Sequence, residues 1–416
     1  MQERYPAPTP TPAWTGPTVI GDTVRFHGRG YGHGVGLSQY GAKGRAAAGQ
    51  DAAEILDHYY QGTTTGTLEP GTPIRVLVLE DDPTSAASPL VLHAHGGPWT
   101  MSGVDGQFPA DATVTVRPTT SDGATTWRLI VTAADGTVLR DAATSYFRMR
   151  PASPATRLEV WNQPSTYDRY RGTLRMILDH TDPIANVVNE IDLELYLRGV
   201  VPAEMPSSWP TEALRAQSIA ARSYAARRLR PGESFFDVRD DTSSQVYLGS
   251  KAEKTATNAA IAATAGQVRM SGSTIANTLF HSAGGGGTEH NENVYVSPTG
   301  ARVAGPVSYL RGSRDRRPDG TAFDDDSPYA TWATATYTRA RLSSILAKDA
   351  RTNVGTLTSI DLRARGVSGR LIKVVLVGSG GTKTVSGDVF RSAFNAGRPA
   401  GDPMLRSTLF DTKPVP

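Results

Sequence analysis

The pattern of hydrophobic residues divides the chain into a β-rich stretch and flanking mixed stretches. Between residues 70 and 190, short runs rich in Val, Ile, Thr and aromatic residues alternate with turn clusters such as DDPTS, SDGA and ADGT. Runs of this kind, bounded by turn residues, are typical of strands. We predict a sheet or small barrel whose strands lie in seven runs: PIRVLVLE, PLVLHAH, ATVTVRP, TWRLIVT, TSYFRMR, RLEVWN and GTLRMILDH.

Helical spacing appears on both sides of this stretch. In DAAEILDHYY, Ala53, Leu56 and Tyr60 are spaced along one helix face, and Asp51 suits the N-cap. The longest predicted helix is PTEALRAQSIAARSYAARRL, which places Leu214, Ser218, Ala221 and Ala225 on one face. Further helices are predicted in KAEKTATNAAIAATAG, ARLSSILAK and DVFRSAF.

These elements predict an α+β fold: a β-rich mixed fold with a few helices around a catalytic cleft. We expect a Pro/Thr-rich linker over 1–18, exposed after removal of a targeting segment. A glycine-rich segment follows over 19–66, then the β-rich region over 67–190 and a mixed region over 191–412. We expect the β-rich region to be interwoven with the other two rather than to fold independently.

Composition narrows the classes of function. The chain has 43 Lys and Arg against 40 Asp and Glu, without a basic run, which argues against a nucleic-acid partner. It has no cysteine, which excludes disulfides, thiolate metal sites and a cysteine nucleophile. No run of about 18 apolar residues is present, so we predict no membrane span. An exported protein fits these features.

The first concentration of candidate chemistry is GRGYGHGVGLSQYGA, residues 28–42. Glycines alternate around a single ionisable group, His33, with Ser38 and Gln39 directly after. The segment matches neither the dinucleotide fingerprint nor the phosphate-binding loop. It is either a backbone that approaches a ligand closely or a tight turn with an incidental histidine.

The second is VVPAEMP, in which Glu204 lies between two prolines. Its apolar neighbours Val200, Val201 and Met205 favour a neutral carboxyl, as a general acid requires. The alternative is a surface carboxylate near the start of the next helix. A second carboxyl for ordinary glycoside hydrolysis would have to come from Asp237, Asp240 or Asp241, which the sequence does not place.

The third is a helix face that carries Gln217, Arg222 and Tyr224. Alanines around Arg222 leave room for a guanidinium to reach a carboxylate, although an arginine extended toward solvent fits equally.

The fourth is FHSAGGGGTEHNE, residues 280–292. Its His281, Glu289 and His290 form either a polar loop that lines a substrate site or a metal site. The spacing is a weak metal signature. We interpret the acidic run Asp324–Asp326 as a solvated loop.

Four stretches resemble the SpoIID/LytB family of cell-wall proteins, which is best known from sporulation. They are LELYLRGVVPAEMPSSWPTEALRAQSIAARSYAARR, DDTSSQVY, LFHSAGGGGTEHNE and GRGYGHGVGLSQYGAKGRAAAGQDAAEILDHYYQGT, together about half of the chain. In the family order the GHGxGxSQ segment comes last, whereas here it comes first. We interpret this as a circular permutation, in which 19–66 packs against 400–412 and brings His33 to the cleft of Glu204.

The resemblance implies a lytic transglycosylase that cleaves the MurNAc–GlcNAc bonds of peptidoglycan strands, expected to be stripped of stem peptides. Glu204 would act as general acid and then as base, forming 1,6-anhydro-MurNAc, and Arg222 would bind sugar or orient the acid. The other matching polar residues would line the cleft: His33, Ser38, Gln39, Gln245, His281 and Ser282, beside Gln217 and Tyr224 on the predicted helix. No cofactor is implied. Some relatives carry a Cys/His zinc site, which a chain without cysteine cannot build.

Two other functions stay open. A non-catalytic module that binds the cell wall and enhances an N-acetylmuramoyl-L-alanine amidase carries the same family label. A metal-dependent hydrolase would use His281, Glu289 and His290. For the transglycosylase and for the amidase-enhancing module, the expected partners are peptidoglycan strands; the module would also have an amidase as its partner. The expected location is extracellular, at the cell wall.

Overall fold

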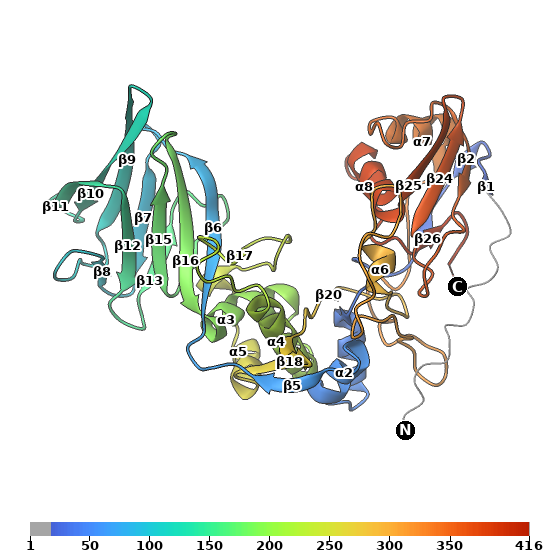
Figure 1. Ribbon diagram of the computed structural model, residues 1–416, viewed down its shortest axis with the longest axis horizontal. Coiled ribbons are helices and arrows are strands. Elements are labelled where there is room, and N and C mark those ends of the chain that lie inside the picture. Colours follow the sequence, from blue (N-terminus) through green and yellow to red (C-terminus); the bar gives the residue numbers. More distant parts are fainter. Residues whose placement is uncertain (1–17, 416) are drawn as a thin grey trace. The chain divides into compact units, whose positions relative to one another are not determined.

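The computed structural model describes residues 18–415, which divide into two compact units. The first combines the N-terminal part of the chain, up to Thr64, with everything from Met270 onward; the second is Thr65–Arg269. In Figure 1 the blue N-terminal strands accordingly lie with the red C-terminal ones. The predicted linker lies outside the described residues except for Thr18. Within the described residues, every helix is too short or too polar to cross a membrane.

The second unit contains two six-stranded sheets, in the orders β17-β6-β16-β15-β12-β8 and β11-β10-β9-β7-β13-β14. Neighbouring strands are antiparallel, except that β17 runs parallel to β6. The strands are β6 (Pro73–Pro83), β7 (Leu90–His95), β8 (Trp99–Met101), β9 (Thr113–Ser121), β10 (Ala124–Thr132), β11 (Val138–Thr144), β12 (Tyr146–Pro151), β13 (Arg157–Val160), β14 (Arg169–Tyr170), β15 (Thr173–Leu178), β16 (Ile184–Asp192) and β17 (Val238–Arg239).

All seven predicted strands are present. Alternate residues are apolar and buried in β7 and β15, whereas β6 and β13 bury consecutive residues. The mixed α+β class is confirmed. Strand β16 was not predicted. Its pattern is interrupted by Asn189, a fully buried amide that donates to the Arg171 carbonyl at 2.7 Å and accepts from the Tyr247 hydroxyl at 2.9 Å.

Four helical segments complete the second unit: α3 (Leu193–Glu204), α4 (Thr211–Ala226), η1 (Gly249–Ala252) and α5 (Thr255–Ala263). The small-residue face predicted for α4 is buried. Helix α3 was not predicted; it begins at the N-cap Asp192 and continues through Pro202. The helix expected to start near residue 251 instead begins at Thr255, after the separate 3₁₀ turn η1.

The first unit is built on a four-stranded sheet, β1-β23-β24-β25, with α7 and α8. Two further strands, β5 (Thr64–Thr67) and β18 (Gln267–Ser271), contain the points where the chain passes between the units. The remaining elements of the first unit are β1 (Thr18–Val19), β2 (Thr23–Val24), β3 (His27–Gly28), β4 (Leu37–Ser38), α1 (Gln39–Ala47), α2 (Ala52–Tyr59), β19 (Thr274–Ile275), β20 (Phe280–His281), α6 (Asn291–Val294), β21 (Trp332–Ala333), β22 (Tyr337–Thr338), α7 (Arg339–Leu346), β23 (Leu357–Asp361), β24 (Lys373–Gly378), β25 (Gly381–Ser386), α8 (Gly387–Gly397) and β26 (Phe410–Asp411).

The N-terminal segment is an integral part of the first unit. Strand β3 lies between β21 and β26, and the ring of Phe26 packs edge-on against Phe390, Phe394 and Phe410 at 5.3–5.8 Å between centroids. The expectation that 19–66 packs against the tail is therefore confirmed, while the circular permutation stays a prediction.

Helix α2 begins at Asp51 as predicted, where Asp51 and Glu54 form a reciprocal capping box. The predicted apolar face is wrong in one position. Ala53 is exposed, and the buried side of the helix consists of Ala52, Ile55, Leu56 and Tyr59.

Candidate functional site

Glu204 is the last residue of α3, so it lies at a helix C-terminus rather than at a helix start. Its side chain is half-buried, while Val200, Val201 and Met205 around it are fully buried. Oε1 accepts a long hydrogen bond, 3.4 Å, from the backbone N–H of Val246. The negative end of the helix dipole and the apolar neighbours both favour a neutral carboxyl over an ionised one.

Two tyrosines of the second unit lie close enough to Glu204 to sense its charge. Burial raises the pKa of Tyr196 and of Tyr224, and the Glu204 carboxylate raises both further. The guanidinium of Arg228 stacks over the Tyr224 ring, 3.2 Å from the ring centroid, and opposes this shift. Both hydroxyls therefore stay protonated at neutral pH and can donate hydrogen bonds.

Gln245 and Gln217 of the second unit are both buried. Gln245 accepts from the Tyr196 hydroxyl at 3.2 Å and donates to the Ala221 carbonyl at 3.4 Å, so it links α3 to α4. Gln217 is fully buried, and neither polar atom of its amide has a hydrogen-bond partner among the described residues. Neither side chain is exposed to a ligand in this structure.

Arg222 is also fully buried, and its partners are structural. It forms a two-pronged ion pair with Glu194, with both N–O distances 2.7 Å. It also donates to the carbonyls of Gln267 and Ile261. The guanidinium thus joins α4 to α3 and to the segment around α5, and we assign it to the framework that holds Glu204 rather than to contact with sugar.

In the first unit, His33 and His281 form a pair of imidazoles 5.4 Å apart between ring centroids. Nδ1 of His33 accepts from the Val35 N–H at 3.0 Å, and Nδ1 of His281 lies 3.3 Å from the Val35 carbonyl. Burial and the nearby Arg370 charge lower the pKa of His33 to about 4. The pKa of His281 falls well below its ordinary value, mainly through burial. Both rings are therefore neutral at pH 7.

The glycines of this segment permit its close packing. Gly34 has a φ of +84°, and a Cβ at this position would lie 2.2 Å from Nε of Arg370. Any side chain would thus displace a fully buried guanidinium, which holds the glycine run by donating to the carbonyls of Gly284 and Gly287.

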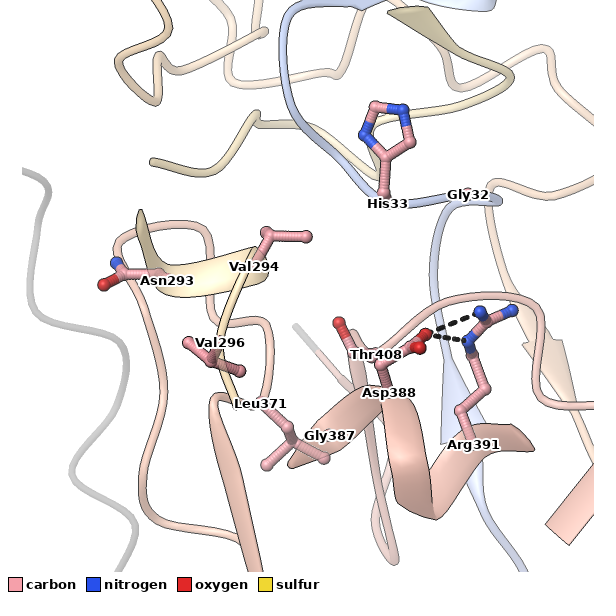
Figure 2. A pocket seen from close by; sticks show the side chains of 10 residues that line it. All are labelled: Gly32, His33, Asn293, Val294, Val296, Leu371, Gly387, Asp388, Arg391 and Thr408. Carbon is pink, nitrogen blue, oxygen red and sulfur yellow. Dashed lines mark hydrogen bonds and ion pairs between the residues drawn. The ribbon is translucent and has the colours of Figure 1, made fainter. Parts of the chain in front are cut away.

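A small cavity of about 30 Å³ lies beside His33 (Figure 2). It has room for about two water molecules, which is far less than a sugar ring needs. One wall of the cavity contains the ion pair between Asp388 and Arg391, so the cavity is lined by a negative and a positive charge beside apolar groups. The lining residues are Gly32, His33, Asn293, Val294, Val296, Leu371, Gly387, Asp388, Arg391 and Thr408.

The two predicted motifs of the first unit are joined directly. Strand β4 pairs in parallel with β20, which places Ser38 opposite His281. The buried Ser38 hydroxyl caps α1 by accepting from Gly41 at 3.1 Å and also accepts from Gly284 at 3.0 Å. Gln39 is buried at the start of α1, and half-buried Ser282 accepts from the Tyr40 N–H through its carbonyl.

The other polar residues of this region hold loops together. Glu289 is 1% exposed and accepts from five donors, among them Val367 and Ser368. His290 accepts from Gly312 at 2.8 Å. Within the described residues, no group of three His, Asp or Glu side chains could hold a metal ion.

The acidic run 324–326 is only partly solvated, so that interpretation was wrong for Asp324. Asp325 and Asp326 are exposed, but Asp324 is 1% exposed because its carboxylate accepts from the N–H groups of Gly285 and Gly286.

The predicted residues therefore fall into two groups, one in each unit. Glu204 and His33 belong to different units, and their approach in one cleft stays a prediction. Sequence reasoning missed Tyr196 and Arg228, which lie near Glu204, and the Glu194 partner of Arg222. Glu194 follows a capping aspartate and lies in an apolar run, which was a weak signal for a buried pair.

Comparison with known proteins identifies part of the chain. Residues 182–270, about a fifth of the chain, match the model of the family described as stage II sporulation protein, SpoIID. The matched part contains Glu204, Gln217, Arg222, Tyr224 and Gln245; the predicted residues of the first unit lie outside it. No solved structure matches the chain significantly.

Three curated relatives match parts of the chain. An uncharacterised protein of Brachyspira hyodysenteriae is 36% identical over 128 residues, which are 30% of this chain and 34% of that protein. The amidase enhancer of Bacillus subtilis is 32% identical over 164 residues, 36% of this chain and 21% of the enhancer. Stage II sporulation protein D of Bacillus subtilis is 54% identical over 43 residues, 10% of this chain and 12% of that protein.

The matches thus span between 12% and 34% of each relative's length. The family match agrees with the resemblance for the part of the second unit that contains α3 and Glu204. Residues 182–270 of this chain match the SpoIID family model.

Proposed function

We propose that the protein is a peptidoglycan lytic transglycosylase in which Glu204 is the single acid–base group. The observation that supports this most is the position of Glu204: half-buried, at a helix C-terminus, beside two protonated tyrosines and inside the SpoIID segment. Such surroundings favour the neutral form of a carboxyl, and a neutral carboxyl can act as a general acid near neutral pH.

In the proposed reaction, the protonated Glu204 donates its proton to the glycosidic oxygen between MurNAc and GlcNAc as the bond to MurNAc C1 breaks. The resulting Glu204 carboxylate then accepts the proton of the MurNAc 6-hydroxyl, whose oxygen bonds to C1 and closes the 1,6-anhydro ring. No water is consumed, and Glu204 ends protonated as it began. One carboxyl is therefore enough.

The surrounding residues divide the remaining tasks. Tyr224 offers a hydroxyl donor near the reacting carboxyl, whereas the buried Tyr196 hydroxyl donates to Gln245. Arg222 and Gln245 tie α3 to α4, which holds Glu204 in place. We propose that the protein acts at the cell wall.

The test is mass spectrometry of products from purified glycan, with and without stem peptides. We expect anhydro-ended products, with faster cleavage of strands that lack stem peptides. Replacing Glu204→Gln should lower the rate about 10³-fold, because general acid–base catalysis by a positioned group contributes of this order. The matched control is Glu233→Gln, an exposed residue of the same unit, which should retain full activity.

Products with ordinary reducing ends would show hydrolysis and overturn the proposed reaction. A second function is favoured by the match to the Bacillus subtilis amidase enhancer: binding of cell-wall glycan that enhances an amidase, without cleavage. It predicts no product from the protein alone, and faster release of stem peptides when an amidase is added.

A further inference from the structure

Asp240 is a carboxyl that the proposed reaction does not use. It follows β17 in the DDTSSQVY segment and is half-buried, yet no Lys or Arg among the described residues forms an ion pair with it. Its neighbours are paired: Asp237 with Arg75, and Glu80 with Arg239. A side chain that donates to Asp240 is Gln163, whose Nε2 lies 3.2 Å from Oδ2.

This environment makes Asp240 titratable near neutral pH. Burial raises its pKa to about 7, helped by the charges of Asp241 and Glu80 and opposed by hydrogen bonds from its own backbone and Gln163. A carboxyl kept partly buried without a cation is costly to the fold, and such groups concentrate at functional sites.

Asp240 and Glu204 both accept hydrogen bonds from the same short segment, Val246–Tyr247. The Asp240 carbonyl accepts from the Tyr247 N–H at 2.9 Å, and the preceding residue, Val246, donates to Oε1 of Glu204. The charges of both carboxylates raise the pKa of Tyr196. Both acids therefore contact the segment Val246–Tyr247, Asp240 through its backbone and Glu204 through its carboxylate, and both lie near enough to Tyr196 for their charges to act on it.

The loop that supplies Gln163 also exposes two aromatic residues. Trp161 is 65% exposed and Tyr167 is 38% exposed, although large aromatic side chains are usually buried. The loop is tied to the Asp240 region, because Gln163 also donates to the Tyr170 hydroxyl at 3.4 Å and that hydroxyl donates to the Tyr167 carbonyl at 3.3 Å. The Trp161 ring contacts His93 of β7 edge-on, with 5.7 Å between ring centroids. Exposed rings on a loop that also supplies a fixed amide are suited to a ligand with apolar faces and many hydroxyls.

We propose that Asp240, Gln163, Trp161 and Tyr167 form a glycan-binding subsite next to Glu204. The rings stack on the apolar faces of N-acetylated sugars, and the Asp240 carboxylate accepts hydrogen bonds from their hydroxyl or amide groups. The proposal rests on the proposed function, since it makes this loop an extension of the glycan path that leads to Glu204.

Binding at this subsite should strengthen as the pH rises through about 7, because an ionised carboxylate accepts stronger hydrogen bonds than a carboxylic acid. The other charged or titratable groups that face Asp240 are Asp241, Glu80, Tyr170 and Tyr196. Hydrogen bonds from Ser243 lower the pKa of Asp241, and burial raises the pKa of Tyr170 well above its ordinary value. Burial also raises the pKa of Tyr196, and Glu80 is paired with Arg239.

The test is calorimetric binding of a β-1,4-linked N-acetylglucosamine oligomer, at about pH 5.5 and about pH 8.5, on either side of the Asp240 pKa. The whole chain carries Glu204→Gln to prevent turnover. Adding Asp240→Asn should weaken binding about tenfold at the higher pH and remove the pH dependence. Adding Trp161→Ala should weaken binding about fivefold at both values.

Two matched controls should leave binding unchanged. Asp241→Asn removes the adjacent exposed carboxylate. Because the Asp241 charge helps to raise the pKa of Asp240, this control is compared at the higher pH, where Asp240 is ionised with or without it. Tyr146→Ala removes a 44% exposed ring on β12, four strands away from β17 in the same sheet. Circular dichroism of each variant verifies the fold.

Unchanged affinity in both Asp240→Asn and Trp161→Ala, or equal losses in the controls, would overturn the subsite, as would selective binding of a lysine-bearing peptide in place of the oligomer. Cleavage by the unmodified protein is measured separately. Loss of the subsite with cleavage intact refutes only this inference, whereas binding with the expected pattern but no cleavage refutes only the proposed reaction.

Discussion

The two motif-bearing regions use their polar side chains in opposite ways. In the glycine-rich region of the first unit, Ser38, His281 and Arg370 are buried and bonded to backbone groups, and the cavity beside His33 is too small for a sugar. Around α3 in the second unit, Glu204 and Asp240 remain half-buried, with polar partners at 3.2–3.4 Å.

This difference separates residues that fix a backbone from residues that are available to a substrate. A buried group whose hydrogen bonds are met by the protein contributes to stability, and replacing it leaves its partners unsatisfied. A half-buried carboxyl costs stability when no cation offsets its charge, as at Asp240, so its retention indicates chemistry or binding. The comparison thus predicts that variants in the first group change stability first, and variants in the second change activity first.

The largest effect on stability is expected at Arg222, which lies on α4 in the same unit as Glu204 but which we assign to the structural framework. Arg222→Met should lower the free energy of unfolding by about 3 kcal/mol, because it leaves Glu194 and two carbonyls without their buried partner. Urea denaturation followed by tryptophan fluorescence measures the loss.

The matched control is Arg215→Met on the same helix. Arg215 is partly exposed and pairs with Glu212 three residues earlier, so its removal should cost less than about 0.5 kcal/mol. If Arg222→Met instead left stability unchanged and raised the KM for glycan, Arg222 would belong with the substrate-contacting residues.

Ser38 tests the division from the other unit, with a smaller expected effect. Ser38→Ala should destabilise by about 1–2 kcal/mol, because one hydroxyl accepts from both Gly41 and Gly284. Thr338→Ala is the control: Thr338 caps α7 from an exposed position through the Arg341 N–H alone, and should cost about 0.5–1 kcal/mol. Equal losses would show that the Gly284 bond adds nothing, and unfolding is again followed in urea.

Much of the framework could be predicted from local pattern alone. Alternating apolar residues located seven strands, and small residues located the buried face of α4, because these features depend on nearest neighbours. The sequence did not reveal that α3 continues through Pro202, because a proline inside a helix removes a backbone hydrogen bond and usually ends or kinks the helix. A helix that extends to Glu204 changes the electrostatics of the candidate acid from a helix start to a helix end.

The candidate site was predictable by residue type but not by role. His33, Ser38 and His281, which the resemblance assigned to one cleft, lie close together in the first unit, while their role as cleft residues stays a prediction. Their burial was not predictable, since it depends on Arg370, which is more than 300 residues from His33 in the chain. Asp240 was one of three equivalent acids in the sequence; only the pairing of Asp237 with Arg75 and the burial of Asp240 distinguish them.

The smallest expected effect concerns the protonation of the paired histidines. The pKa of His33 is lowered to about 4 in the folded protein, against about 6.5 for an unfolded chain. The folded state therefore binds fewer protons than the unfolded state between these values, and its stability, fully present above pH 6.5, is lost as the pH falls toward 4.

Because His33 is only half-buried, we expect it to account for about 1 kcal/mol of stability lost between pH 7 and pH 5. NMR titration of the imidazole resonances measures the cause directly: His33 should titrate near pH 4 and His281 lower still. His33→Gln should then flatten the pH dependence of the urea midpoint. If His33 titrated near pH 6.5, it would be a solvent-accessible acid–base group, and the contrast between a fixed histidine region and an available carboxyl region would fail at its most accessible residue.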